Sequence, residues 1–323
     1  MSAQEALSGW TEETLKDPAV AALREKIAEH GGISGLEILE SDNRDRIRQL
    51  FHRDGFVVIG GILDDEQIDF LAKGCDEVMR EIVTLDNERA GNRGAHRYSF
   101  GGSSLTRSQL HRPEWQMLLE LTVVQEIVAD LFGSPHFSLR AASGDFCLPG
   151  AVDYQILHSD VRDWVDDTQS PFSAFHDPNG HVSIRDLPCP YLCVNFLPQD
   201  ITRLNGPTRQ IPGTHKSRTP IPTLAEEPEW MRLSTVCPVS AGGIMIRDVR
   251  AWHGGTPNLT DAPRAIPNLE FYAPWFREQI VPGINHADYL KLSERSQEIA
   301  KFCVADSNTQ LETGTVFKPL RRK

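Results

Sequence analysis

The stretch VDYQILHSD, residues 152–160, joins an apolar, strand-like run to a histidine and an aspartate. Short strands separated by Gly, Pro and Asn turns are typical of antiparallel barrels and jelly rolls. The chain has such segments on both sides of this stretch: FSLRAAS (137–143), YLCVNFL (191–197), PTRQIPGTH (207–215), GIMIRDVRAWH (243–253) and PNLEFYAPW (267–275). We therefore predict a mainly β chain with flanking helices, an α+β protein built around an antiparallel β barrel or jelly roll.

The region before residue 136 has helical patterns instead. A short buried strand is predicted at Phe56–Ile59, and Asp64 or Asp65 can cap the helix that follows. A second helix is predicted over residues 113–132, closed by Gly133. Residues 86–109 are polar and Gly-rich and are predicted to form a long loop.

The simplest domain organisation has one β domain. We expect a helical N-terminal extension at 1–46, the β domain at 47–275 with an inserted loop at 163–188, and a helical, then irregular, tail at 276–323.

Composition excludes several classes of partner. The net charge is −12 over 323 residues, which argues against nucleic acid and acidic membranes, because both favour clustered Lys and Arg. The six cysteines form no C-x-x-C pair, so neither a disulfide framework nor a structural zinc site is expected. The N-terminus has no signal-peptide pattern, and no apolar run approaches 18 residues. We expect a cytoplasmic protein of unknown oligomeric state.

The H-x-D pattern occurs three times, and local context separates the three. His158 and Asp160 end a β-like run, and residues two apart in a strand point to one face, so both can reach one ion. HRD at 52–54 lies where a helix gives way to a turn, and HAD at 286–288 resembles a helix start. A fourth cluster, FHDPNGH at 175–181, is better explained as an exposed turn.

His253 is the best candidate for a third ligand, because it also closes an apolar β run, in AWHGG. Two histidines and one carboxylate on one face leave three positions open on an octahedral ion, which suits non-haem Fe(II) chemistry with O2. The alternative is a strand-end histidine with a hydrogen bond, and spacing alone leaves both open.

Arg264 favours the interpretation of His253 as a metal ligand over that of a hydrogen-bonded strand-end residue. The chain turns at 258–263 and re-enters a strand at Arg264, which should place this residue near His253 but deeper in the barrel. A buried guanidinium needs an anion, and its fork fits a carboxylate. An iron with three open positions beside an arginine-bound dicarboxylate is the working site of a 2-oxoglutarate oxygenase. The alternative for Arg264 is a surface ion pair.

The chain resembles the phytanoyl-CoA dioxygenase-like family of Fe(II)/2-oxoglutarate oxygenases. The resemblance spans about residues 47–275 and rests on four motifs together: DGFVVIGGILDDEQI (54–68), HSD (158–160), NGPTRQIPGTHKS (205–217) and WHGGTPNLTDAPR (252–264). The step of eleven residues from His253 to Arg264 is one that this family uses. The resemblance implies a double-stranded β-helix of the jelly-roll or cupin type.

The resemblance also implies roles for particular residues. His158, Asp160 and His253 would be the iron ligands, and Arg264 would hold the distal carboxylate of 2-oxoglutarate. Cosubstrate-binding positions of the family correspond here to Thr208 and Gln155. Within NGPTRQIPGTHKS, His215 is better explained as a structural residue. Candidate residues for the substrate pocket rim are His96, Arg97, Tyr98, Phe100, Trp164 and Phe175.

The implied activity is the oxidation, by default hydroxylation, of an unactivated C–H bond in a small molecule, using Fe(II), 2-oxoglutarate and O2 and releasing succinate and CO2. Asp160 disfavours halogenation, because a chloride would need its coordination position. A natural product or amino-acid-like substrate is expected, because an acyl-CoA would favour a basic patch. Desaturation, epoxidation and cyclisation stay open. The alternative functions are a non-oxidative divalent-metal hydrolase or isomerase on the same fold, and a non-catalytic ligand-binding relative.

Overall fold

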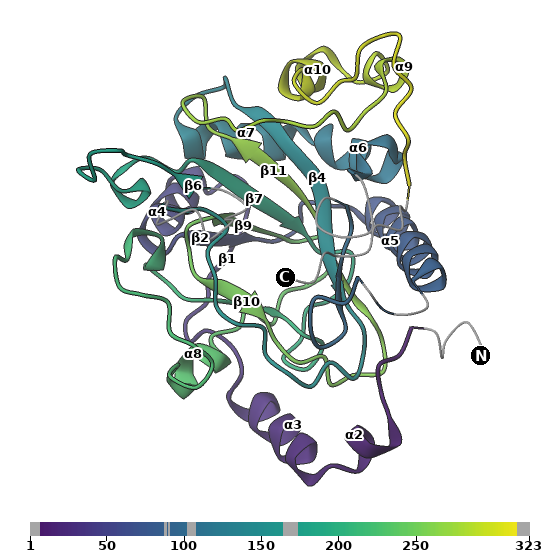
Figure 1. Cartoon of the computed structure of the whole chain (residues 1–323), viewed down its shortest axis with the longest axis vertical. Helices are drawn as coiled ribbons and strands as arrows, with labels where there is room; N and C mark the ends of the chain where they lie inside the picture. Colours follow the sequence, from purple (N-terminus) through teal and green to yellow (C-terminus); the bar gives the residue numbers. More distant parts are fainter. Residues whose placement is uncertain (1–6, 87–88, 90, 102–107, 164–173, 315–323) are drawn as a thin grey trace.

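The centre of the computed structural model is a seven-stranded sheet in the order β1-β2-β9-β7-β11-β4-β3 (Figure 1). The structure describes residues 7–86, 89, 91–101, 108–163 and 174–314. Neighbouring strands are antiparallel except β1 and β2, which are parallel. The strands are β1 (Ile38–Leu39), β2 (Phe56–Ile59), β3 (Arg97–Ser99), β4 (Ser138–Cys147), β7 (Tyr191–Phe196), β9 (Ile244–Asp248) and β11 (Arg264–Tyr272).

A second, smaller β layer contains His253 and the segment that ends at Asp160. Strands β8 (Thr208–Gln210) and β10 (His253–Gly255) pair antiparallel outside the large sheet. The segment 151–160 runs beside β10 through isolated bridges, one of which joins His158 to His253. A short parallel pair, β5 (Arg162–Asp163) and β6 (Ala174–Phe175), follows this segment. The antiparallel jelly-roll core expected from the turn pattern is confirmed.

The two faces of the large sheet differ in chemistry. Register places Arg264 opposite Cys147 and Cys147 opposite Arg97, so these three residues form one row across three strands. We call the face that carries this row the inner face. Because side chains alternate along a strand, the same face carries Asn268 and Glu270 of β11. The inner face therefore carries several buried polar residues beside an apolar cluster that includes Met245 and Ile266.

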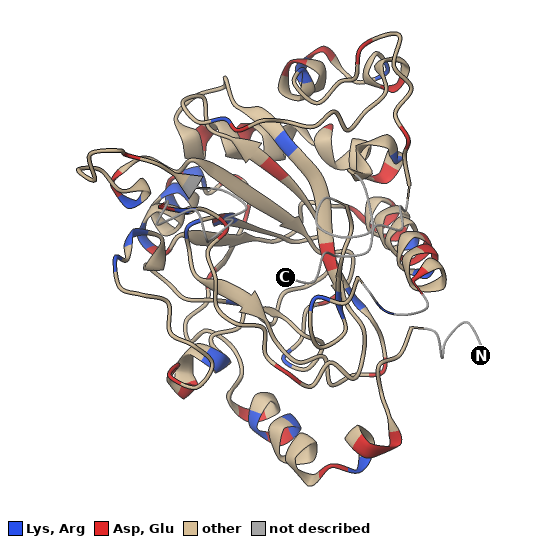
Figure 2. Ribbon diagram, viewed as in Figure 1, with Lys and Arg blue, Asp and Glu red and all other residues tan. Residues whose placement is uncertain are grey.

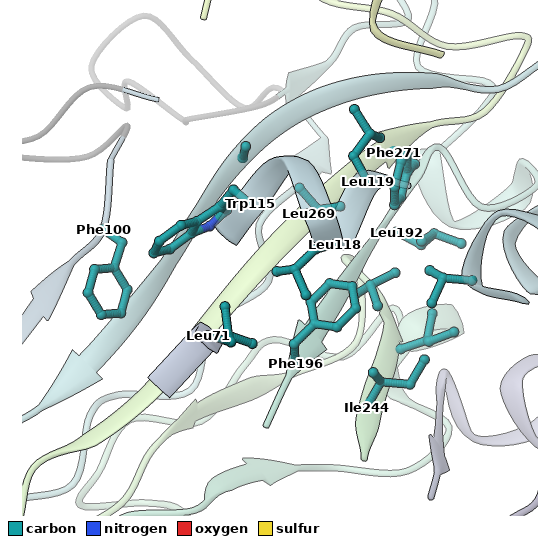
Figure 3. Packing of buried hydrophobic residues seen from close by; sticks show 14 of the residues in the cluster. Leu71, Phe100, Trp115, Leu118, Leu119, Leu192, Phe196, Ile244, Leu269 and Phe271 are labelled. Atoms are coloured by element: carbon teal, nitrogen blue, oxygen red, sulfur yellow. The ribbon is translucent and has the colours of Figure 1, made fainter. Parts of the chain in front are cut away.

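The opposite face is apolar and is covered by helices, as Figure 3 shows for Leu118 and Leu119 packed against Leu269. Trp115, Phe196, Phe271 and Ile244 are buried in the same cluster. The helices on this face are α4 (Arg44–Asp54), α5 (Asp65–Leu85), α6 (Pro113–Leu119) and α7 (Thr122–Phe132). Figure 2 shows charged residues on the helices and loops, with others on strands such as β4.

The ends of the described chain add shorter elements around the core. Helices α2 (Glu12–Lys16) and α3 (Pro18–His30) extend away from the sheet, and α9 (His286–Tyr289) and α10 (Glu294–Ala300) lie at the opposite end (Figure 1). Single turns of helix form η1 (Gln109–His111), η2 (Ile184–Asp186), η3 (Thr214–Lys216) and α8 (Glu229–Leu233). Among the described residues, every helix is too short or too polar to cross a membrane.

Three local expectations need correction. The helix predicted over 113–132 is two helices, because the chain breaks between α6 and α7 at residues 120–121. The segment 152–160 is extended but makes only isolated bridges instead of a regular strand. The loop at 86–109 contains β3, which pairs with β4. Strand β2, the Asp64 cap of α5 and the left-handed Gly133 cap occur as predicted.

Candidate metal centre

Two distant segments of the chain meet at His158 and His253. Each residue donates its backbone N–H to the carbonyl of the other, at 3.0 Å in both directions. The backbone N–H of Asp160 donates to the carbonyl of Val249 at 2.8 Å. The 158–160 segment is thus tied on one side to β10 and on the other to the end of β9. The side chains of the three residues lie together for this reason.

His158, Asp160 and His253 each offer a ligand atom, and these atoms lie within 4.8 Å of one another. The Nε2 atoms of His158 and His253 are 3.7 Å and 3.6 Å from oxygens of Asp160. The Nδ1 atom of each histidine lies against a backbone carbonyl, that of Ile156 at 3.1 Å and that of Ala251 at 3.0 Å. A proton on Nδ1 leaves Nε2 with its lone pair free, which is the tautomer that a metal ion needs.

The charges around Asp160 favour its ionised form. Burial opposes ionisation of this carboxyl, but the cationic groups around it, among them Arg247, outweigh burial and hold the pKa of Asp160 below its usual range. Burial and the cation of Arg247 lower the pKa of His253. The centre therefore holds one carboxylate and an uncharged His253, a donor set that fits a divalent cation such as iron.

Arg264 begins β11 and points into the protein on the inner face. Its side chain is buried, and its Nε donates to the carbonyl of Gly206 at 2.9 Å. Among the described residues, no carboxylate pairs with it. Burial lowers the pKa of Arg264, but an arginine stays protonated in a protein. A buried cation without an acidic partner is a candidate site for a ligand anion.

The two glycines after His253 make room for buried arginines. A Cβ on Gly255 would lie 2.5 Å from Nε of Arg97, and one on Gly254 would lie 3.2 Å from Nε of Arg209. Arg97 donates to the carbonyls of Asp153 and Thr256, at 2.7 Å each. It therefore joins the segment before His158 to the strand after His253 and is not a rim residue.

Thr208 and Gln155, the expected cosubstrate-binding residues, both lie beside β10. Thr208 pairs directly with Gly255 and is half-buried. The Oε1 atom of Gln155 accepts the backbone N–H of Gly255 at 2.9 Å. The carbonyl of Gln155 accepts from Arg209, whose guanidinium also pairs with buried Glu227.

The predicted rim residues do not form one surface. Tyr98 and Phe100 are fully buried and pack against Phe146, with ring centroids 5.1 and 5.0 Å apart, so they are core residues instead. His96 is half-buried and lies against Gly9 of the N-terminal extension. Phe175 packs beside Val161 and Tyr191, near the metal centre. Trp164 lies outside the described residues.

The rival histidine clusters do not assemble a ligand set. Among the described residues, only His158, Asp160 and His253 bring three such side chains together. Asp54 pairs with Arg53, and Asp288 pairs with Lys291. Asp177 accepts backbone N–H groups of the turn that follows it, at residues 179–182.

Sequence reasoning missed the arginines of RDVR at 247–250. Arg247 donates to Oδ2 of Asp160 at 2.6 Å. Arg250 pairs with Asp248 and donates to carbonyls of Ile184 and Leu187, which fastens the described end of the insert. Strand alternation before His253 could have indicated that Arg247 points inward, but not which acid it meets.

A jelly-roll sheet that presents two histidines and one carboxylate on one face is typical of non-haem iron enzymes. The family model for phytanoyl-CoA dioxygenase (PhyH) matches residues 51–266, more than half of the chain. The chain belongs to the phytanoyl-CoA dioxygenase family and is a non-haem iron, 2-oxoglutarate-dependent enzyme.

Solved structures with this fold include HygX from Streptomyces hygroscopicus with nickel and 2-oxoglutarate bound. The identity is 17% and the TM-score 0.52, over 75% of this chain and 92% of HygX. AviO1 from Streptomyces viridochromogenes Tue57 is 20% identical with a TM-score of 0.48, over 73% of this chain and 97% of AviO1. At 17% identity, the likeness to HygX shows a shared fold.

Proposed function

We propose that this enzyme hydroxylates an unactivated C–H bond of a small organic substrate, with His158, Asp160 and His253 as the iron ligands. The observation that carries the proposal is the combination of three converging ligand atoms with a buried arginine, on the inner face of the large sheet, that pairs with no acid among the described residues. An iron ion with open positions needs a cosubstrate, and the buried cation of Arg264 needs an anion, so a dicarboxylate cosubstrate satisfies both needs.

The protein's own part is to hold the reactants in place. His158 and His253 offer Nε2, and their Nδ1 contacts to backbone carbonyls keep the rings oriented. Bound iron, together with 2-oxoglutarate and O2, supplies the oxidising power and releases succinate and CO2.

Arg264 is the proposed partner of the distal carboxylate of 2-oxoglutarate. Its Nε is occupied by Gly206, which orients the guanidinium and leaves the two terminal nitrogens for a bidentate pair. Thr208 and Gln155 are proposed to line the cosubstrate pocket, since both lie beside Gly255 on the strand of His253.

The proposed substrate class is a natural product or amino-acid-like metabolite. HygX, which shares the fold, has been seen with hygromycin B bound, an example of a small molecule accepted on this architecture. The net charge of −12 disfavours an acyl-CoA, whose phosphates would call for clustered basic residues. Asp160 keeps the coordination position that a halide would need, so oxygen insertion is favoured over halogenation. Phe175 remains the proposed substrate-facing residue among the described ones.

Anaerobic titration of the protein with Fe(II) and 2-oxoglutarate tests the proposal. The expected result is a visible charge-transfer band in the wild type that is lost in H158A and H253A. H286A and H52A serve as matched controls, since both histidines lie outside the metal centre, and both should keep the band. A wild-type protein without the band would contradict the proposed function.

A substrate screen addresses the finer part of the proposal. Candidate small molecules are incubated with the reconstituted enzyme, and succinate formation above the substrate-free background is measured. A product heavier by one oxygen is expected by mass spectrometry. A product that has lost two hydrogens, or one that is isomeric with the substrate, would exclude hydroxylation as the outcome.

A further inference from the structure

Arg247 is a buried arginine on β9, and its contact with the metal centre is direct. Its Nη2 donates to Oδ2 of Asp160 at 2.6 Å, and only 9% of its side chain is exposed. The strand register places Arg247 opposite Cys193 of β7, and Cys193 opposite Glu270 of β11. Arg247 therefore reaches Asp160 from the inner face of the large sheet.

Glu270, a second acid on the inner face, does not replace Asp160 as the partner of Arg247. Glu270 lies two strands away from Arg247 and pairs with Arg140, which also lies over the ring of Tyr191. Asp160 is thus the acid to which Arg247 donates a hydrogen bond. Burial disfavours the guanidinium charge, while Cys193, Asp160 and Glu270 favour it and keep the pKa of Arg247 raised.

We propose that Arg247 is a positioning residue that makes Asp160 offer one oxygen, Oδ1, to the metal and withholds the other. The inference rests on the proposed function, because it concerns the ligand role of Asp160. A carboxylate with both oxygens free can bind a cation through both, whereas an oxygen that accepts a charge-assisted hydrogen bond gives up electron density to that bond and is the poorer metal ligand.

The consequence is a vacant coordination position. Two histidines and one carboxylate oxygen leave three positions open on an octahedral ion. Bound 2-oxoglutarate would use two of these, and O2 would need the third. A second oxygen from Asp160 would compete with the cosubstrate, so Arg247 keeps the site ready for 2-oxoglutarate.

The test compares R247M, R247Q and R247K with R140M as the matched control. R140M removes another inner-face arginine, whose ion pairs go to Glu270 and Glu278 and not to Asp160. Affinity for 2-oxoglutarate is measured from the anaerobic Fe(II) charge-transfer band, and crystal structures are determined of the nickel complexes. Circular dichroism confirms that each variant is folded, and R247Q decides the question if R247M does not fold.

We expect R247M and R247Q to lose about tenfold or more in affinity for 2-oxoglutarate, with Asp160 binding nickel through both oxygens. R247K should recover most of the affinity, and R140M should match the wild type. A general loss of structure would instead weaken R140M and R247M alike. Unchanged affinity in R247M, or a nickel complex in which its Asp160 still uses one oxygen, overturns the inference. A wild type without the band would instead overturn the proposed function.

Discussion

Replacing Arg264 by methionine should weaken cosubstrate binding while leaving the ligand-free protein as stable as before or more stable. Arg264 is 3% exposed, and its hydrogen-bond partner is a backbone carbonyl rather than a carboxylate. Methionine has a similar length and no charge. The variant therefore removes the proposed anion partner and, with it, the cost of burying a guanidinium without an acid.

The loss of affinity follows from the buried charge pair that 2-oxoglutarate would form. Truncating one partner of such a pair costs about 2–5 kcal/mol. Because every 1.4 kcal/mol is tenfold, we expect the Kd for 2-oxoglutarate to rise roughly 30-fold to 4,000-fold.

Stability should move in the other direction, and R209M gives the contrast. Arg209 is fully buried and paired with Glu227, which is equally buried. Removing Arg209 leaves that carboxylate unpaired, at a cost of about 3–5 kcal/mol. In R264M, the carbonyl of Gly206 loses one donor, about 1 kcal/mol, and relief of the buried charge offsets this.

The assay is a pair of measurements on each variant. Urea unfolding of the ligand-free protein gives the free energy of unfolding, and anaerobic titration with Fe(II) present gives the Kd for 2-oxoglutarate. The reasoning fails if R264M loses several kcal/mol of stability and keeps wild-type affinity, because Arg264 would then be a structural residue.

Three further predictions concern the surroundings of the site. Burial lowers the pKa of His215 below its ordinary 6.5, although nearby Asp248 acts in the opposite direction. The uncharged His215 therefore stabilises the fold above about pH 6.5, and this stability is lost as the pH falls. Acid unfolding of H215Q should begin at lower pH than that of the wild type, and superimposable curves would contradict this. Burial raises the pKa of the Cys303 thiol from 9.0 to about 12, so the stability of the fold should decline as the pH rises from about 9 towards 12. All six cysteines are buried, so Ellman's reagent at pH 8 should react only after unfolding. Rapid reaction of a thiol in the native protein would refute this burial. G255A should displace the Arg97 side chain, which lies 2.5 Å from the added carbon, and cost about 1–3 kcal/mol in urea unfolding; an unchanged midpoint would show that Arg97 adapts freely.

Much of the fold follows from local patterns. Asp64 caps α5 and Gly133 closes α7 in a left-handed conformation, and both depend on chemistry within a few residues. The break between α6 and α7 was missed because 113–132 reads as one helical run, whose apolar residues serve two helices. Strand β3 was missed because pairing with β4, not its own polar sequence, makes it a strand.

The candidate site divides in the same way. His158, Asp160 and His253 could be proposed from their positions at the ends of β-like runs, because strand periodicity is a local property. Their convergence depends on the bridge between His158 and His253, which joins residues 95 positions apart. Spacing alone therefore left a hydrogen-bonded histidine as an equal alternative.

The sequence by itself determined the class of chemistry, because the two histidines, the carboxylate and the downstream arginine lie in short motifs that can be recognised without the structure. Only the tertiary structure decided what each buried arginine does: Arg209 meets Glu227, Arg250 meets Asp248 and Arg247 meets Asp160. Arg264 meets no acid among the described residues. The physical reason is that the role of a buried charge depends on its partner, which for Arg209 and Arg247 lies 18 and 87 residues away in the sequence.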